Sequence, residues 1–300
     1  MSQTIDAVLG VSRAPFLLLS VTLVAAGAAA GAYDGGFSWL HTVLALVGLI
    51  CLHASVNALN EASDMRTGID LRTVRTPFSG GSGTLPAGAM TARQAQWLGL
   101  ALAGVGLLIG IYFLSRLGWV LVPIIVLGAI CVLAYTDVLA RLGLGELFAG
   151  LGLGALPVMG AAIVQRGALG PAAIAAGVPA FFMTFNLLLL NEFPDEQADT
   201  IGGRRNLVLV LGRRGAALVY ALAAIATPMS IGASVYAHAL PVLALAGIVP
   251  SIALAGPLQW ALSRPEQPVP LPAMGANVTW NLATNSVLAA TLFIAAALQW

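Results

Sequence analysis

Residues 41–64 read HTVLALVGLICLHASVNALNEASD, an apolar run of membrane-spanning length that ends in two acidic residues. An α-helix needs about 20 predominantly apolar residues to cross a bilayer. Residues 39–59 meet that requirement, and Asn60, Glu61 and Asp64 follow directly. This stretch therefore predicts a transmembrane helix that carries carboxylates at one end.

Apolar runs of the same length recur through the chain. Of its 300 residues, 59% are hydrophobic and only 8% are charged, whereas soluble proteins carry about 25% charged residues. The predicted spans are about 14–33, 39–59, 94–114, 117–136, 146–165, 170–190, 214–236, 239–261 and 279–299. None alternates in polarity as the strands of a membrane β-barrel do. We therefore predict an all-α fold, a polytopic membrane helical bundle of about nine transmembrane helices.

The charge composition excludes several classes of protein. The 13 basic residues are all arginine and face 12 acidic residues, for a net charge of +1. No large basic face can form, so we expect no nucleic-acid partner. Cys51 and Cys131 both lie in apolar runs; they are too few for a disulfide framework and wrongly spaced for zinc. We expect most charged residues to determine topology or to serve a function.

The arginines also predict an orientation in the membrane. With the N-terminus in the cytoplasm, only Arg116 and Arg166 lie on the outer side. The inner segments hold Arg13, Arg66, Arg72, Arg75, Arg93, Arg141, Arg204, Arg205, Arg213, Arg214 and Arg264. Because cytoplasmic loops carry an excess of basic residues, we predict a multi-pass protein of the cell inner (cytoplasmic) membrane with a cytoplasmic N-terminus. The alternative is a cleaved signal peptide ending near Ala28-Ala29-Ala30.

Seven of the twelve acidic residues fall in two short windows, one from Asn60 to Asp70 and one from Asn191 to Asp199. Both windows begin N-E-x-x-D, and both directly follow an apolar span. The second lies 131 residues after the first, four spans later. We interpret them as an internal repeat. The prediction is one transmembrane domain, residues 1–300, built of two pseudo-repeated four-helix halves with acid motifs at 60–70 and 191–199.

The spacing within each window places its polar residues on one helical face. The pairs four residues apart are Asn60 and Asp64, Asn191 and Asp195, and Asp195 and Asp199. Two facing acidic clusters repel one another unless cations lie between them. Mg²⁺ is typically held by one or two carboxylates together with substrate phosphates. These residues therefore predict a diphosphate site bridged by Mg²⁺, with loop arginines on the phosphate oxygens.

Arginines and glycines follow each acidic window, in inner loops expected over about 60–93 and 191–213. In the first loop, Arg72 and Arg75 precede Ser-Gly-Gly-Ser-Gly at 79–83, whose backbone N–H groups can approach an anion. In the second loop, Arg204 and Arg205 follow two glycines. Both loops are therefore candidates for phosphate binding.

Two other interpretations remain open on the residues alone. The acidic clusters could be solvated helix ends, although the scarcity of charge and the repetition disfavour this. They could also belong to a cation-coupled membrane transporter, whose ion ligands are expected near the midplane on broken helices. The clusters lie instead at span ends beside arginines, which suits an anionic substrate better.

The paired motifs resemble the UbiA superfamily of intramembrane prenyltransferases, most closely its MenA branch, the 1,4-dihydroxy-2-naphthoate polyprenyltransferases. The branch pattern N-[DE]-x-x-D-x5-D corresponds to residues 60–70, and its second motif and the following G-[KR]-x-[TN]-L segment correspond to residues 191–212. Tyr135-Thr136 and Gly143-Leu144-Gly145-Glu146 resemble the Y-T and G-L-G-[ED] stretches between them. The likeness covers about residues 55–215.

The resemblance implies a nine-helix bundle with a central cavity capped by the two loops. It assigns Mg²⁺ to Asp64, Asp70, Asp195 and Asp199. It assigns catalysis to Asp64, Asp195, Asn60 and Asn191, and diphosphate binding to Arg72, Arg75, Arg204 and Arg205. The implied reaction is Mg²⁺-dependent ionisation of a polyprenyl diphosphate and alkylation of a small aromatic acceptor, 1,4-dihydroxy-2-naphthoate, as in menaquinone biosynthesis. The polyprenyl tail would lie among the helices, near membrane lipid.

The chain departs from the branch pattern at Glu61, Glu192 and Pro194. Pro194 replaces an arginine of that pattern, and Arg204, Arg205, Arg72 or Arg75 could supply its contact with the diphosphate instead. Glu192 and Pro194 are expected near the acceptor pocket, so the acceptor could also be a benzoate, a glyceryl ether or a porphyrin-type alcohol. Without an acceptor, the protein would be an intramembrane terpene cyclase.

Overall fold

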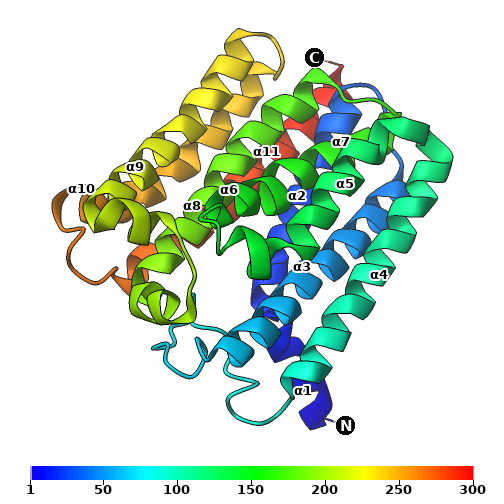
Figure 1. The fold of residues 1–300 in the computed structure, drawn as a ribbon. Helices are drawn as coiled ribbons and strands as arrows, with labels where there is room; N and C mark the ends of the chain where they lie inside the picture. Colours follow the sequence, from blue (N-terminus) through cyan, green and yellow to red (C-terminus); the bar gives the residue numbers. More distant parts are fainter. Residues whose placement is uncertain (1, 300) are drawn as a thin grey trace.

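The computed structural model describes residues 2–299, which form helices and connecting loops without any β-strand. The N-terminal half contains α1 (Ser2–Val11), η1 (Ala14–Leu17), α2 (Leu18–Tyr33), α3 (Trp39–Thr67), α4 (Ala92–Leu117), η2 (Gly118–Leu121), α5 (Val122–Leu133) and η3 (Tyr135–Leu139). The remainder contains α6 (Gly145–Gly150), η4 (Leu151–Ala155), α7 (Leu156–Arg166), α8 (Pro171–Gly202), α9 (Leu207–Tyr236), η5 (Val242–Leu254), α10 (Ala255–Ser263) and α11 (Leu271–Leu298). The predicted all-α bundle is confirmed (Figure 1).

Eight helical stretches within the described residues are long and apolar enough to cross a membrane. The predicted spans 94–114 and 117–136 fall in one of them, Ala92–Leu133, which is 42 residues long. That stretch consists of α4 and α5, which turn at η2 and pack together where Gly110 meets Ile125. The chain is therefore a multi-pass integral membrane protein, and its nine predicted spans occupy eight continuous apolar stretches.

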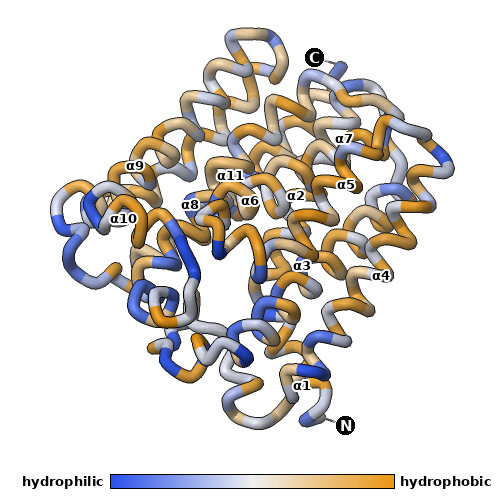
Figure 2. The backbone as a smooth tube through the Cα atoms, in the orientation of Figure 1, coloured by the Kyte–Doolittle hydropathy of each residue, from blue (hydrophilic) through white to orange (hydrophobic). Residues whose placement is uncertain are grey.

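Large apolar side chains cover the outside of the bundle. Trp119 is 84% exposed and Ile252 is 77% exposed, as expected of side chains that face lipid rather than water. Hydrophilic residues are concentrated at one end of the bundle, near α1 and the end of α3, whereas residues in the middle of the helices are predominantly hydrophobic (Figure 2). The polar ends of α3 and α8 thus lie on the same side of the molecule.

Small residues allow the helices to approach closely, as is typical of membrane bundles. A Cβ atom on Gly99 of α4 would lie 2.8 Å from Leu59 of α3, and one on Gly106 would lie 2.5 Å from Leu52. Ser55 Oγ donates a hydrogen bond of 2.7 Å to the Gly99 carbonyl at the same interface. These contacts fix α4 against α3 and thereby fix the end of α3 that carries the first acid motif.

Apart from Asp70, which follows α3, both acid motifs lie on helices that continue beyond the predicted spans. Helix α3 extends to Thr67 and α8 to Gly202, so the predicted loop boundaries at 60 and 191 were wrong. Each helix ends at a glycine with left-handed backbone, Gly68 (φ 76°) and Gly203 (φ 75°), a conformation that glycine adopts without strain. The first loop is therefore residues 68–91, and the second is only residues 203–206.

Candidate active site

A cavity of about 230 Å³ lies between the ends of α3 and α8. Its lining comes from both acid motifs, the glycine-rich loop, η3 and the segment after α8. The motif residues among its lining are Asn60, Asp64, Asp70, Asn191, Asp195 and Asp199. The structure therefore brings together all six acid-motif residues that the sequence predicted as catalytic or metal-binding.

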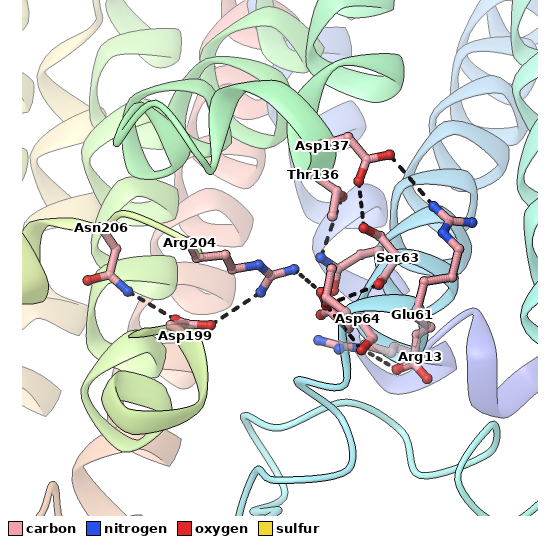
Figure 3. Close-up of polar contacts among 12 residues, drawn as sticks. Arg13, Glu61, Ser63, Asp64, Thr136, Asp137, Asp199, Arg204 and Asn206 are labelled. Atoms are coloured by element: carbon pink, nitrogen blue, oxygen red, sulfur yellow. Dashed lines mark hydrogen bonds and ion pairs between the residues drawn. The ribbon is translucent and has the colours of Figure 1, made fainter. Parts of the chain in front are cut away.

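Arg204 joins the two acid motifs. Its Nη2 donates a hydrogen bond to Asp64 Oδ1, and its Nη1 lies 3.6 Å from Asp199 Oδ1. Figure 3 shows the guanidinium group between the two carboxylates, one from α3 and one from α8. Burial alone would lower the pKa of Arg204, but the Asp64 and Asp199 carboxylates overcome this and raise it above its usual value. Arg204 thus stays positively charged at the centre of the site.

Asn60 lies beside this ion pair. In the amide orientation that satisfies its surroundings, its nitrogen donates to Asp64 Oδ2 over 3.2 Å, and its oxygen accepts from Arg204 Nη2 over 2.6 Å. Asn60 therefore contacts both partners of the ion pair from one turn deeper in α3, which is the helical spacing that the sequence predicted.

Asn206 holds the second motif in place. This residue is the N-cap of α9, where its Oδ1 accepts a hydrogen bond from the backbone N–H of Leu209 over 2.9 Å. Its Nδ2 donates to Asp199 Oδ2 over 3.0 Å (Figure 3). One side chain thus begins α9 and orients a carboxylate of the cavity.

Asp70 approaches the site from the loop after α3. Its side chain is buried, and a Cβ atom on Gly81 would lie 2.7 Å from Asp70 Oδ1. The glycine-rich loop can therefore pack on this carboxylate only where it has no side chain. Burial, reinforced by the charges of Asp64 and Glu61, raises the pKa of Asp70 to about 7.

Four carboxylate oxygens of the cavity are buried without a hydrogen-bond partner in the described part of the chain: Asp70 Oδ2, Glu192 Oε2, Asp195 Oδ1 and Asp199 Oδ1. Buried polar groups normally have partners, and hard divalent cations take carboxylate oxygens. Within residues 2–299, no three His, Cys, Asp or Glu side chains converge closely enough to hold an ion alone. The donor set fits Mg²⁺ that is held partly by substrate phosphates.

The four arginines predicted to bind diphosphate separate into two pairs. Arg204 and Arg205 line the cavity, whereas Arg72 and Arg75 are exposed and do not line it. Arg75 Nη2 donates to the backbone carbonyl of Asp70 over 3.2 Å. In this structure Arg75 thus supports the loop, while Arg204 and Arg205 face the site.

A second, apolar cavity of about 430 Å³ adjoins the polar one. It is formed by α3, α4, α5 and α7, and nearly all of its lining is aliphatic. Five residues line both cavities: Leu49, Leu52, Gly128, Val132 and Gly152. The polar site therefore continues into an apolar space within the bundle.

Comparison with known proteins identifies the family. The model of the UbiA prenyltransferase family matches residues 18–282. The chain belongs to the UbiA prenyltransferase family. It is 26% identical over 179 residues to the 1,4-dihydroxy-2-naphthoate octaprenyltransferase of Bacillus subtilis (strain 168), a match that covers 59% of this chain and 56% of that protein. The chain thus spans little more than half the length of this curated relative.

Solved structures of UbiA homologues share the fold. The homologue from Archaeoglobus fulgidus bound to GPP and Mg²⁺ has a TM-score of 0.70 at 15% identity, over 97% of this chain and 99% of that one. The apo homologue from Aeropyrum pernix K1 has a TM-score of 0.70 at 18% identity, over 93% and 98%. A digeranylgeranylglyceryl phosphate synthase has a TM-score of 0.66 at 13% identity, over 99% of each chain.

The UbiA cavity also contains residues that the sequence did not assign to a functional site. Arg13 lines the cavity from the junction of α1 and η1, although the sequence marked it only as a topology determinant. Arg13 lies far from both motifs in the sequence, and the residues around it form no pattern that indicates a role in the site. The hydrogen bond between Asn206 and Asp199 could have been expected, because Asn206 follows the second motif directly and has the residue type of a helix N-cap.

Two glutamates differ in their relation to the cavity. Glu146 is 1% exposed, and its Oε1 accepts a hydrogen bond of 2.6 Å from the backbone N–H of Leu207 at the start of α9. The side chain of Glu192 lines the cavity, and its Oε2 is buried without a hydrogen-bond partner in the described part of the chain. Glu146 therefore acts as an anchor for α9, and Glu192 is the member of the pair that faces the cavity.

Proposed function

We propose that this UbiA-family protein transfers an isoprenyl group from a polyprenyl diphosphate to a small aromatic acceptor. The observation that carries the proposal is the joining of two acid motifs, through Arg204, at the polar end of a cavity that continues into an apolar space. A prenyl diphosphate has the same division into a charged head and an apolar tail. The Archaeoglobus fulgidus homologue, which shares the fold, was solved with GPP and Mg²⁺.

Mg²⁺ would be held by the carboxylates of Asp64, Asp70, Asp195 and Asp199, of which the last three each have a buried oxygen without a hydrogen-bond partner in the described part of the chain. When bound, Mg²⁺ would neutralise charge that develops on the departing diphosphate. Asn60 and Asn191 lie on the same helical faces one turn deeper in the cavity and are proposed to support the bound diphosphate.

The chain's own residues account for the rest of the chemistry. As the bond between the first carbon of the prenyl group and oxygen breaks, its electron pair leaves with the diphosphate. Arg204 and Arg205 are placed to donate hydrogen bonds to the phosphate oxygens, a charge-assisted interaction that strengthens as negative charge grows. The aliphatic wall of the adjoining cavity excludes water from the allylic carbon, which is then attacked by a ring carbon of the acceptor. That ring carbon loses its proton, or its carboxylate as CO₂, and the ring regains its aromaticity.

The acceptor we propose is 1,4-dihydroxy-2-naphthoate, which would lose its carboxylate as CO₂ and give a prenylated naphthoquinol, the reduced form of a demethylmenaquinone-like lipid. The support is the 26% identity with the Bacillus subtilis 1,4-dihydroxy-2-naphthoate octaprenyltransferase, together with Tyr135-Thr136 and the Gly-Leu-Gly-Glu stretch at 143–146. Tyr135 and Glu192 both line the cavity, which supports an acceptor site on this part of its wall.

The test is to incubate purified protein in lipid nanodiscs with geranylgeranyl diphosphate and Mg²⁺, with and without the naphthoate. The proposal expects diphosphate release that depends on the acceptor, and a prenylated naphthoquinol by mass spectrometry. Release without acceptor, together with a cyclic hydrocarbon, would show a terpene cyclase instead. No release with any donor, combined with cation-dependent substrate flux across liposomes, would show a transporter.

A further inference from the structure

The arginines that line the cavity differ in how fully they are already engaged. Within residues 2–299 the cationic side chains of its lining are Arg13, Arg204 and Arg205. Arg204 pairs with Asp64 and Asp199, and Arg204 and Arg205 are already proposed to bind the diphosphate. Arg13 is therefore the cation whose purpose the site has not yet explained.

Arg13 is held by a buried carboxylate. Its Nε donates to Glu61 Oε1 over 3.1 Å, and Glu61 is 0% exposed. Its Nη1 and Nη2 donate to no protein atom in the described part of the chain, so they remain available to a ligand. A guanidinium group fixed at Nε with two free nitrogens matches the geometry of a phosphate.

The same carboxylate holds the glycine-rich loop. Glu61 Oε1 accepts a hydrogen bond from the backbone N–H of Ser82 over 2.6 Å, and Oε2 accepts one from Ser82 Oγ over 2.8 Å. The neighbouring loop residues Ser79, Gly80 and Gly81 line the cavity. Glu61 thus joins helix α3, the N-terminal segment and the loop that closes over the site.

The backbone around Arg13 is fixed as well. Arg13 has left-handed backbone (φ 50°, ψ 53°), which is uncommon for a residue with a side chain and is maintained only where neighbours enforce it. The Ser12 carbonyl accepts a hydrogen bond of 2.9 Å from Asn57 Nδ2 of α3. The strained turn therefore places Arg13 against α3, one helical turn from Asn60.

Arg13 shares the cavity with carboxylates of both acid motifs, Asp64 and Asp70 from the first and Asp195 from the second. Arg13 makes no hydrogen bond with any of the three in the described structure. Arg13 is therefore in the cavity of the proposed diphosphate site, and in the described structure it pairs with Glu61 of the first motif rather than with the aspartates proposed to hold Mg²⁺.

We propose that Arg13 binds the diphosphate of the substrate, and that Glu61 is the positioning residue that holds both Arg13 and the glycine-rich loop against the cavity. This inference rests on the proposed function, because it assigns two further residues to the cavity that is proposed to bind the diphosphate. It also explains why the carboxylate at position 61 is buried rather than directed into the cavity.

The experiment compares Arg13→Gln, Glu61→Gln, Ser82→Ala and the double variant Arg13→Gln/Glu61→Gln. Arg66→Gln is the matched control, because Arg66 pairs with Asp137 near the same end of α3 but is half-exposed and outside the cavity lining. The measurements are KM and kcat for geranylgeranyl diphosphate, KM for the acceptor, and the shift in Tm caused by inorganic diphosphate with Mg²⁺.

The proposal expects Arg13→Gln to raise KM for the donor roughly tenfold to hundredfold, as loss of a charge-assisted hydrogen bond does, with acceptor KM within about twofold. Glu61→Gln should raise the same KM, and the double variant should show less than the product of the single effects because the two residues act together. Ser82→Ala should give a smaller rise through the loop alone. Arg66→Gln should match the wild type.

An unchanged donor KM in folded Arg13→Gln protein would overturn the role of Arg13, and independent effects in the double variant would overturn that of Glu61. If Glu61→Gln does not fold, Arg13→Gln still tests diphosphate binding by Arg13, and Ser82→Ala still tests the hydrogen bond by which Glu61 holds the loop. The Tm shift separates this inference from the proposed function. If inorganic diphosphate raises the Tm of the wild type but not that of Arg13→Gln, the role of Arg13 in diphosphate binding is supported even without turnover. An equal Tm shift in both proteins contradicts that role.

Discussion

Arg204 shows how single residues set the properties of this site. Its guanidinium group lies between Asp64 of α3 and Asp199 of α8 (Figure 3), so the two motifs are held together by one cation before any substrate binds. All three side chains are less than one-fifth exposed. Such a pair is costly to break from one side, because the remaining charges stay buried without compensation.

The first prediction follows from this ion pair. Arg204→Gln should lower the free energy of unfolding by about 2 kcal/mol, because Asp64 and Asp199 then face one another without a cation. Mg²⁺ should recover part of the loss. Thermal unfolding in nanodiscs, with and without Mg²⁺, measures both effects. Arg214→Gln is the control, since its pair with Glu266 is exposed and should contribute little. An Arg204→Gln protein as stable as the wild type would contradict the bridging role.

The second prediction concerns the two motifs as one site. Asp64→Asn and Asp195→Asn should each reduce turnover about a hundredfold or more, and the double variant should be little worse than either single variant, because residues that act as a unit lose activity non-additively. The measurement is the initial rate at saturating Mg²⁺, with the exposed Glu266→Gln as control. High residual activity in either single variant would mean that the site uses only one motif.

At the scale of helices, the site depends on how closely α3 and α4 pack. Gly99 and Gly106 of α4 leave no room for a side chain against Leu59 and Leu52, and the Ser55–Gly99 hydrogen bond lies on the same line of contact. The motif residues on α3 are one to two turns further along. A change in this interface should therefore move the site as well as destabilise the bundle.

The third prediction is that Gly99→Val lowers the free energy of unfolding by about 1–3 kcal/mol, the usual cost of overpacking. Gly232→Val is the matched control: Gly232 is also a helical glycine, but no atom lies within 4 Å of an added Cβ there. Both variants make the same change in helix propensity, Gly to Val. The difference between their Tm values therefore isolates the cost of overpacking α4 against α3. Equal Tm values would show that α4 can shift away from α3 without cost.

The helices also show what the sequence could and could not predict. The i, i+4 spacing correctly placed Asn60 with Asp64 and Asp195 with Asp199 on helical faces. Apolar length alone could not show that α3 and α8 continue through polar residues to Gly68 and Gly203, because their last turns lie beyond the apolar window. The role of Arg13 depends on a tertiary contact with Glu61, 48 residues away, and no local pattern reports such a contact. Arg72 and Arg75 had the expected residue type, but the loop directs them away from the cavity lining.

At the scale of the whole molecule, the elements that form the site lie at the end of the bundle where hydrophilic residues are concentrated. The ends of α3 and α8, the glycine-rich loop and α1 lie together at the hydrophilic end of the bundle (Figure 2). The loop Ala237–Pro241 after α9 lies at the other end of a helix that starts beside the site. The arginine distribution predicts that the site end faces the cytoplasm.

The fourth prediction is therefore a labelling pattern in intact cells. In a variant without Cys51 and Cys131, single cysteines at Ala87 and Gln197, both exposed near the site, should react with an impermeant maleimide only after the membrane is permeabilised. A cysteine at Ala237, exposed at the opposite end, should react from outside. Labelling of either site position from outside would reverse the proposed orientation.

The central claim is that the two acid motifs form one Mg²⁺-dependent site for a prenyl diphosphate. The most direct measurement is the Kd of geranylgeranyl thiodiphosphate, which ionises slowly, for the wild type, Asp64→Asn and Asp195→Asn with and without Mg²⁺. The account predicts tight binding by the wild type only with Mg²⁺, and loss of that metal dependence in both variants, one from α3 and one from α8. Binding that is equally tight without Mg²⁺, or unchanged in either variant, would contradict it.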